Sequence, residues 1–345
     1  MFEVLFSGCR SGRFPLEYAR AHHGDRVTVH AYDAYQARKI REDVGGKSNV
    51  QVLCSAGLPA DASYTHAFYC ATTKLVSAEL ELDTLQDIHR HLADGATLVA
   101  EGVEPETLRK LFGKVVASRA SRRAPVKCVC TKKGELKRIR SFEAEFEASV
   151  PGGPKLRLTS LPGCFCHRRA DEGGLALAEV ASRELAETAP AAGTSGILDI
   201  GCGCGLVGLL VADAMRRNGA TSVPLTLVDS HTRAIEAAKR NASALGFDAE
   251  CVLSDEGLPP DHPGIGGFAV ALANPPYYGD GRIADHFAEI AHVALAPGGV
   301  CWMVAKTPDM IREACERRFC DVQSVKRRGY TVLRAVKRPD GGETA

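Results

Sequence analysis

An asparagine, two prolines and a tyrosine form the pattern in this sequence with the most specific chemistry: Asn274, Pro275, Pro276 and Tyr277. Consecutive prolines cannot continue a sheet and hold the chain extended. The side-chain carbonyl of Asn274 and the main-chain carbonyl of Pro275 then form a pair of fixed acceptors. Such a pair suits the hydrogens of a planar NH2 group, whose delocalised lone pair must be aimed at an electrophilic methyl group by positioning. Tyr277 would stack on the planar substrate. The alternative is a proline-rich turn that only ends a strand.

A glycine-rich loop at residues 201–205 directly follows a short apolar run and opens a helical pattern. Glycine permits positive φ angles and lets a ligand approach the backbone closely. After the next two apolar runs, Asp229 could accept hydrogen bonds from ribose hydroxyls and Asp255 from an adenine amino group. Taken singly, each aspartate fits a helix cap or a turn equally well. Together they predict a nucleoside-containing ligand, either a dinucleotide or S-adenosylmethionine. The residues expected to hold it are Asp199, Gly201, Cys202, Gly203, Gly205, Asp229, Ser230, Asp255 and Asn274.

The second half of the chain alternates between strand and helix patterns that would position these residues. This order predicts a mostly parallel sheet with helices on both faces and ligands beyond the carboxyl ends of its strands. The expected strands are 196–200, 225–229, 250–253, 268–273 and 300–305, the helices 205–218, 232–245, 283–295 and 308–319, and the closing hairpin 322–326 with 330–337. Every residue of the candidate site then follows the carboxyl end of a strand.

Over about residues 165–340, these motifs resemble class I S-adenosylmethionine-dependent methyltransferases that act on exocyclic or amide nitrogen. A narrower resemblance, to the RsmC/RlmG group of ribosomal RNA guanine-N2 methyltransferases, is carried by Leu-Thr-Ser-Leu-Pro-Gly-Cys-Phe at 158–165 and Ala-Asp-Glu-Gly-Gly at 170–174. Residues 274–281 and 295–299 fit the same group. The resemblance implies S-adenosylmethionine as cofactor, guanine N2 of ribosomal RNA as target with the small subunit favoured, and Asp171 as a substrate-side residue. Tyr277 departs from the phenylalanine usual in the group, and Gly174 from threonine or serine.

The first half repeats this order of elements, which predicts a duplicated domain. Its strands are expected at 27–33, 49–54, 66–71 and 97–101, its helices at 34–42 and 79–92, and its hairpin at 115–117 with 126–130. The binding chemistry is not repeated, because residues 8–12 form a degraded glycine loop and Thr72, Thr73 and Lys74 lack paired acceptors. We therefore predict an α/β protein of two tandem Rossmann-like class I methyltransferase domains, each a mostly parallel sheet with an antiparallel closing hairpin. Residues 1–141 form a degenerate domain that binds no cofactor and supports structure and RNA binding, and residues 142–345 the catalytic domain.

A basic stretch at residues 119–140 holds nine lysines and arginines against one glutamate, although the net charge of the chain is only +1. Such a concentration of positive charge favours phosphate binding, with an ordinary solvated face as the alternative. The residues expected to contact RNA here are Arg122, Arg123, Lys132 and Lys133. A smaller basic cluster lies at 317–328. The target guanine would be flipped out or unpaired, and the partner would be ribosomal RNA or a ribosomal subunit particle.

Length and composition narrow the class of protein. The 345 residues favour two domains, and no apolar run reaches the length of a membrane span. The thirteen cysteines include no CxxC pair, and three pairs have a single residue between them, so reduced thiols without a metal are expected. A monomeric, cytoplasmic enzyme is the prediction. Four other functions remain open: methylation of a protein glutamine N5 or of adenine N6, an NAD-dependent oxidoreductase, and an inactive RNA-binding protein.

Overall fold

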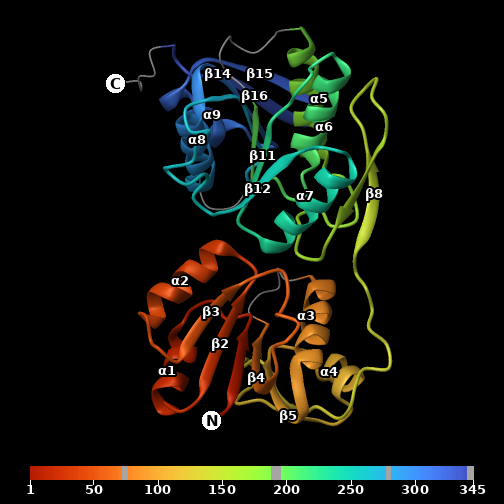
Figure 1. Ribbon diagram of the computed structural model, residues 1–345, viewed down its shortest axis with the longest axis vertical. Coiled ribbons are helices and arrows are strands. Elements are labelled where there is room, and N and C mark those ends of the chain that lie inside the picture. Colours follow the sequence, from red (N-terminus) through yellow and green to blue (C-terminus); the bar gives the residue numbers. More distant parts are fainter. Residues whose placement is uncertain (72–76, 188–195, 277–280, 340–345) are drawn as a thin grey trace. The chain divides into compact units, whose positions relative to one another are not determined.

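The computed structural model describes residues 1–71, 77–187, 196–276 and 281–339 and divides the chain into two compact units, Met1–Phe142 and Glu143–Ala345 (Figure 1). Each unit has its own sheet and its own buried apolar clusters. In the part of the chain that is described, no helix has both the length and the apolar character needed to cross a membrane.

The first unit holds a seven-stranded sheet of order β3-β2-β1-β4-β5-β7-β6 in its described residues. Strands β1 to β5 run parallel, and β7 and β6 close the sheet antiparallel. The strands are β1 (Glu3–Ser7), β2 (Arg26–Ala31), β3 (Val50–Cys54), β4 (Tyr64–Cys70), β5 (Leu92–Glu101), β6 (Val115–Ser118) and β7 (Lys127–Thr131). The helices are α1 (Arg13–Ala21), α2 (Ala34–Val44), α3 (Ala78–His91) and α4 (Pro105–Phe112).

The described residues of the second unit form a sheet of the corresponding order, β12-β11-β10-β13-β14-β16-β15. The strands are β10 (Ile197–Ile200), β11 (Leu225–Asp229), β12 (Ala249–Leu253), β13 (Phe268–Ala273), β14 (Leu295–Ala305), β15 (Cys320–Arg327) and β16 (Tyr330–Val336). The helices are α5 (Glu172–Glu187), α6 (Leu206–Arg217), α7 (Thr232–Ala244), α8 (Arg282–Ala294) and α9 (Asp309–Arg318). A separate hairpin, β8 (Ala144–Ala148) and β9 (Leu156–Ser160), precedes them.

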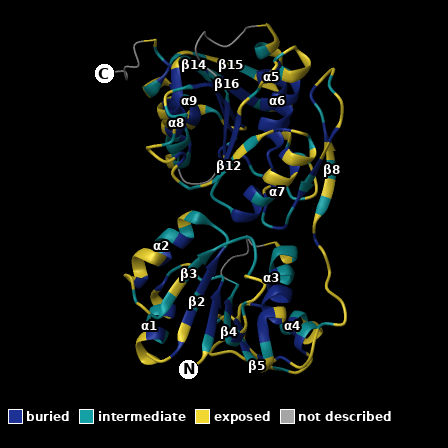
Figure 2. Ribbon diagram, in the orientation of Figure 1, coloured by how far each residue is buried: buried dark blue, intermediate teal, exposed yellow. Residues whose placement is uncertain are grey.

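The equal strand order in the two sheets confirms the predicted fold of two tandem, mostly parallel α/β domains with antiparallel closing strands. The apolar runs that predicted central strands are fully buried: every residue of β10 and β13 is buried. Figure 2 shows buried residues concentrated in the strands of both sheets. Several elements were not predicted, among them β1, the β8–β9 hairpin and α5, although β1 contains the short buried apolar run 4–6. Two glycines in its first turn weaken the helix signal of α5.

Candidate active site

The register of the second sheet brings the predicted motifs together at one edge. Ile200 pairs with Ala273 across β10 and β13, so Gly201 and Asn274 each follow a paired residue. On the other side, Asp229 of β11 pairs with Leu253 of β12. The glycine loop, Asp229 and Asn274 therefore share the carboxyl edge of this sheet, where ligands of parallel sheets bind.

The glycine loop adopts the backbone conformation that its composition predicts. Gly201, Gly203 and Gly205 have φ of +68°, +57° and +86°, values that residues with a Cβ rarely adopt. The loop is anchored because the N–H groups of Gly201 and Cys202 donate to the Val228 carbonyl at 2.8 and 3.0 Å. A Cβ on Gly203 would meet no atom of the described residues within 4 Å. The backbone at Gly203 thus faces open space that a ligand could fill.

Asp229 is held against this loop by both of its carboxylate oxygens. Oδ2 accepts from the N–H of Gly203 and Oδ1 from the N–H of His231, both at 2.8 Å. Each oxygen of a carboxylate has a second acceptor site, so the group can also accept from ribose hydroxyls. The half-buried Ser230 lies beside it in the chain.

Asp199 lies near the end of β10, two residues before the glycine loop. It is buried, and its Oδ2 accepts from the N–H of Gly208 in the first turn of α6 at 2.8 Å. Burial raises the pKa of Asp199 to about 7, the hydrogen bond from Gly208 opposes this shift, and the charge of Asp229 adds to it. This contact stabilises the first turn of α6, and the role of Asp199 in cofactor binding stays a prediction.

The loop cysteines are buried free thiols. Burial raises the pKa of Cys204 to about 12 and that of Cys202 well above its usual value. Both thiols stay protonated near neutral pH, which disfavours a role as nucleophile or metal ligand. Within the described ranges, no three or more histidine, cysteine or acidic side chains cluster in a way that could hold a metal ion.

Asn274 is placed by a contact across 103 residues of sequence. Its Nδ2 donates to Oδ2 of Asp171 at 2.8 Å. Pro275 is buried and Pro276 is half-buried, as expected for a stiff segment that ends β13. Tyr277 lies outside the described residues.

Asp255 follows β12 and is half-buried, at the position where an adenine contact was expected. Its main-chain carbonyl accepts from Nε2 of His286 on α8 at 2.9 Å. The neighbouring Phe287 packs so closely on the glycine loop that a Cβ on Gly201 would lie 2.9 Å from its ring. No motif in the sequence marks these two α8 residues.

Asn241 on α7 is a buried residue that supports the site and was not predicted. Its Nδ2 donates to the carbonyls of Cys204 and Thr159 at 2.9 and 2.8 Å, and its Oδ1 accepts from the N–H of Thr159 at 2.7 Å. These three bonds tie the glycine loop to β9. A single polar residue on a helix gives no sequence signal for such a role.

The basic stretch 119–140 is mostly exposed, but one predicted RNA contact is wrong. Arg122, Arg123 and Lys133 are exposed. Lys132 is buried, and its ammonium group donates to the Leu92 carbonyl and to Glu135, both at 2.8 Å. A side chain held in this way cannot reach RNA phosphates.

The smaller basic cluster at 317–328 is also occupied by contacts within the unit. Arg317 and Arg318 pair with Asp285 at 2.6 and 2.7 Å. Arg327 and Arg328 bind the buried Glu179. Burial alone would raise the pKa of Glu179, but its hydrogen bonds to the two arginines hold the pKa below the usual value. These four arginines therefore help to stabilise the second unit.

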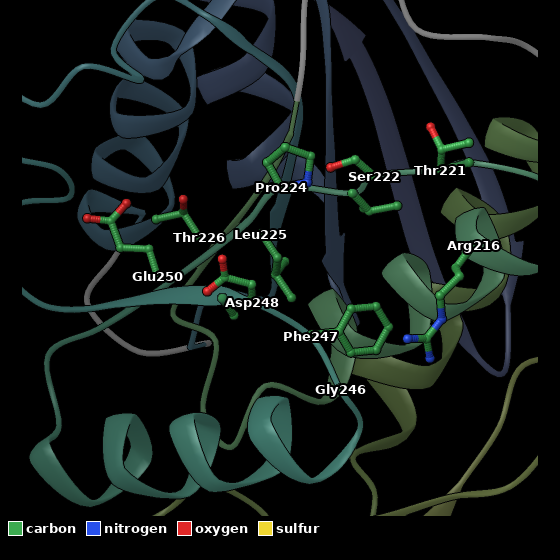
Figure 3. A pocket seen from close by; sticks show the side chains of 13 residues that line it. Arg216, Thr221, Ser222, Pro224, Leu225, Thr226, Gly246, Phe247, Asp248 and Glu250 are labelled. Atoms are coloured by element: carbon green, nitrogen blue, oxygen red, sulfur yellow. The ribbon is translucent and has the colours of Figure 1, made fainter.

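A cavity of about 560 Å³ opens at the amino ends of β11 and β12 (Figure 3). The guanidinium group of Arg216 lies over the Phe247 ring there, 4.1 Å from its centroid. The sheet edge involved is opposite to the one that carries the glycine loop and Asn274. No residue of the predicted site lines this cavity.

Known proteins are similar in sequence to this chain. The chain is 27% identical to ribosomal RNA large subunit methyltransferase G of Ectopseudomonas mendocina (strain ymp) over 263 residues, which are 72% of this chain and 66% of the relative. It is 33% identical to ribosomal RNA small subunit methyltransferase C of Hahella chejuensis over 168 residues, 48% of this chain and 44% of the relative. The chain thus spans less than two thirds of the length of either curated relative.

A solved structure with the same two-domain fold is the T. thermophilus 16S rRNA N2 G1207 methyltransferase (RsmC) in complex with AdoMet and guanosine. The TM-score is 0.73 at 22% identity, covering 97% of this chain and 88% of the other. The family model described as the methyltransferase small domain matches residues 155–334, more than half of the chain. The chain belongs to the methyltransferase small domain family.

Proposed function

We propose that this protein transfers a methyl group from S-adenosylmethionine to the exocyclic N2 of guanine in ribosomal RNA. The observation that carries the proposal is the placement of Asn274 and Pro275 directly beyond β13, next to the strand that leads into the glycine loop. The names of the curated relatives, both ribosomal RNA methyltransferases, support the choice of substrate. The similar T. thermophilus enzyme was solved as a complex with AdoMet and guanosine, which supports the choice of cofactor and base.

The residues present fit S-adenosylmethionine. The backbone at Gly203 faces space that no described residue fills, and Asp229 holds its carboxylate beside that space. Ribose hydroxyls would bind Asp229, and Asp255 would bind the adenine amino group. When bound, S-adenosylmethionine supplies an electrophilic methyl group.

The residues of this chain position the guanine amino group for the methyl transfer. Oδ1 of Asn274 and the carbonyl oxygen of Pro275 accept the two hydrogens of the guanine amino group. This grip turns the nitrogen lone pair toward the methyl group, so no strong base is needed before the attack. Tyr277 would stack on the base. The base would enter this site flipped out or unpaired.

The exposed lysines and arginines of residues 119–140 would bind RNA phosphates. Eight of the nine in this stretch are exposed: Arg119, Arg122, Arg123, Lys127, Lys133, Lys137, Arg138 and Arg140. We propose that this unit binds RNA and no cofactor, and that a monomer acts in the cytoplasm on small-subunit RNA or on a ribosomal particle.

Transfer of labelled methyl to total RNA and to total protein from cells lacking this gene tests the proposal. Nucleoside analysis should find the label in N2-methylguanosine. Label in N6-methyladenosine or in protein glutamine would identify adenine or glutamine as the substrate instead of guanine. Tyr277 is compatible with both of these alternatives. Binding of NAD without binding of S-adenosylmethionine in calorimetry would contradict the whole proposal.

A further inference from the structure

We propose that Asp171 is a positioning residue that fixes the orientation of the Asn274 amide. The inference rests on the proposed function, since it explains which atom of the Asn274 amide faces the guanine amino group. Its basis is the 2.8 Å hydrogen bond from Nδ2 of Asn274 to Oδ2 of Asp171. Both side chains are half-buried, so the bond is partly shielded from water.

The direction of this bond decides what Asn274 presents to a substrate. An asparagine amide can turn by 180° and exchange its acceptor for its donor with little change in shape. A carboxylate has only acceptors, so the atom that faces Asp171 must be the NH2 group. Oδ1 of Asn274 is then directed away from Asp171 as an acceptor for the amine. In the opposite orientation, the Asn274 NH2 group would meet the guanine NH2 group, and two donors cannot bond.

Asp171 is itself held in place by contacts that do not involve Asn274. Oδ2 also accepts from the N–H of Gly174 at 2.7 Å, and the main-chain carbonyl accepts from the N–H of Leu175 at 2.9 Å. These bonds fix the carboxylate at the start of α5. The thiol of Cys166 approaches Oδ1 at 3.5 Å. The acceptor that orients Asn274 is therefore in place before a substrate binds.

The segment before Asp171 is anchored to α7. The guanidinium group of Arg233 donates to the Pro162 carbonyl at 3.3 Å, and the thiol of Cys164 lies 3.5 Å from the Arg233 carbonyl. Because Arg233 and Cys164 are buried, these contacts are shielded from water. The segment thus places a carboxylate beside the end of β13.

The same geometry explains why glycine is tolerated at position 174. The contact with Asp171 uses the main-chain N–H of Gly174, which any residue except proline would offer. The departure from threonine or serine in the RsmC/RlmG group leaves this bond intact.

The test compares Asp171→Ser with the full-length wild type. Serine can still cap α5 through its hydroxyl, but its shorter side chain cannot also reach Asn274. We expect kcat for methyl transfer to fall by about 10- to 100-fold. KM for RNA and the affinity for S-adenosylmethionine should stay within about twofold, because in this role Asp171 contacts Asn274 in place of the substrate contact expected from the sequence.

Two further variants separate positioning from a structural role. Asp33→Ser makes the same change at the cap of α2, where Asp33 accepts from the N–H of Gln36, and should keep wild-type kcat. In an Asn274→Ala background, Asp171→Ser should change the residual single-turnover rate no further, since the two residues act as one unit. Additive losses would overturn the inference.

Asp171→Asn provides an independent variant if the serine variant unfolds. Its amide oxygen can take the place of Oδ2 but can also turn away, so kcat should fall by a smaller factor at unchanged KM. Wild-type kcat in Asp171→Ser, or in Asp171→Asn when the serine variant is unfolded, would overturn the positioning role while leaving the proposed function intact. A wild-type protein that methylates no guanine would overturn both.

Discussion

The two sheets of this protein have the same strand order, but their carboxyl edges differ in how polar groups are used. In the second unit, Asp229 follows the second strand and accepts from the N–H of Gly203 in the glycine loop. In the first unit, Asp33 stands after the corresponding strand, but its carboxylate caps α2 through the N–H of Gln36 at 3.0 Å. The Gln36 side chain in turn binds the Cys9 carbonyl of the loop after β1.

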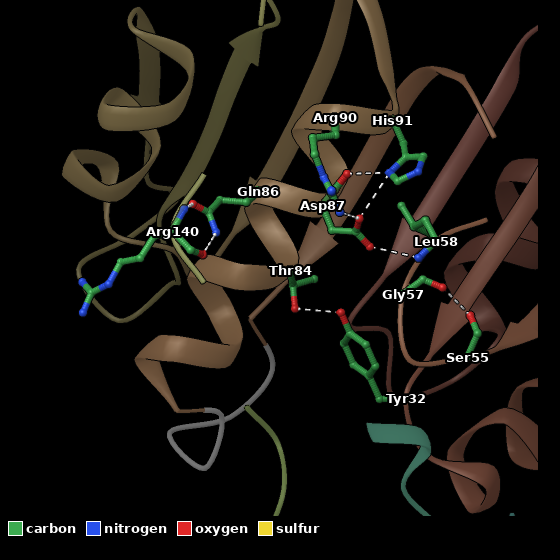
Figure 4. A network of polar contacts seen from close by, with 10 residues as sticks. All are labelled: Tyr32, Ser55, Gly57, Leu58, Thr84, Gln86, Asp87, Arg90, His91 and Arg140. Atoms are coloured by element: carbon green, nitrogen blue, oxygen red, sulfur yellow. Dashed lines mark hydrogen bonds and ion pairs between the residues drawn. The ribbon is translucent and has the colours of Figure 1, made fainter. Parts of the chain in front are cut away.

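Other described residues beyond the first unit's strands also make internal contacts (Figure 4). The Tyr32 hydroxyl contacts Thr84 of α3 at 3.1 Å, and the carboxylate of Asp87 accepts from the N–H of Leu58 at 2.9 Å. A Cβ on Gly8 would overlap the Cys70 carbonyl oxygen, so the backbone there has no room for a ligand. The comparison shows that two sheets of the same strand order carry different polar contacts at their carboxyl edges.

Among the variants that test this difference between the two sheet edges, Gly203→Ala should have the largest effect. The new methyl group would enter open space beside Asp229, and the φ of +57° adds backbone strain. We expect the Kd for S-adenosylmethionine in calorimetry to rise by about 10-fold or more, roughly 1.4 kcal/mol. Gly45→Ala is a matched control, since Gly45 has φ +60° and an equally open surrounding but lies in the first unit. Equal Kd values for the two variants would argue against a ligand at Gly203.

The first unit's role in RNA binding can be tested by replacing Arg122, Arg123 and Lys133 together with glutamine. We expect affinity for a ribosomal RNA fragment to fall by about 10-fold at moderate salt, and the slope of log affinity against log salt to decrease by about 2. The matched control removes the same charge from Arg26, Arg38 and Lys39, which pair with Glu3 or Glu42. Equal losses for both triple variants, measured by filter binding, would point to net charge instead of this surface.

A smaller effect is expected for Asp199→Asn on the pH dependence of stability. The pKa of Asp199 is raised to about 7 in the folded protein, above its usual value near 4. The stabilisation from its bound proton is therefore fully present below about pH 4 and is lost as pH rises to about 7. Asparagine does not titrate, so the unfolding free energy of wild type minus that of the variant should fall across this interval in urea titrations. A difference that stays constant with pH would contradict the burial of a carboxyl group at this position.

Local patterns were enough to predict much of the fold. The predicted ranges 225–229 and 268–273 coincide with β11 and β13, because buried parallel strands are continuous apolar runs bounded by polar residues. The positions of the glycine loop and Asp229 could be predicted in the same way, because the loop follows one such apolar run and Asp229 ends another.

Contacts between distant segments could not be predicted in this way. The bond between Asp171 and Asn274 joins residues 103 positions apart, and the three bonds of Asn241 depend on how α7 packs against β9 and the glycine loop. The burial of Lys132 shows the same limit, since a run of charges does not reveal which member a backbone carbonyl will bind.

The most direct test of the account is Asn274→Ala, assayed for N2-methylguanosine in RNA and for S-adenosylmethionine affinity by calorimetry. Loss of the amide removes one of the two acceptors for the guanine amine, so turnover should fall by at least about 100-fold. The Kd for S-adenosylmethionine should stay within about twofold, because the glycine loop and Asp229 are unchanged. Turnover close to wild type would contradict the account.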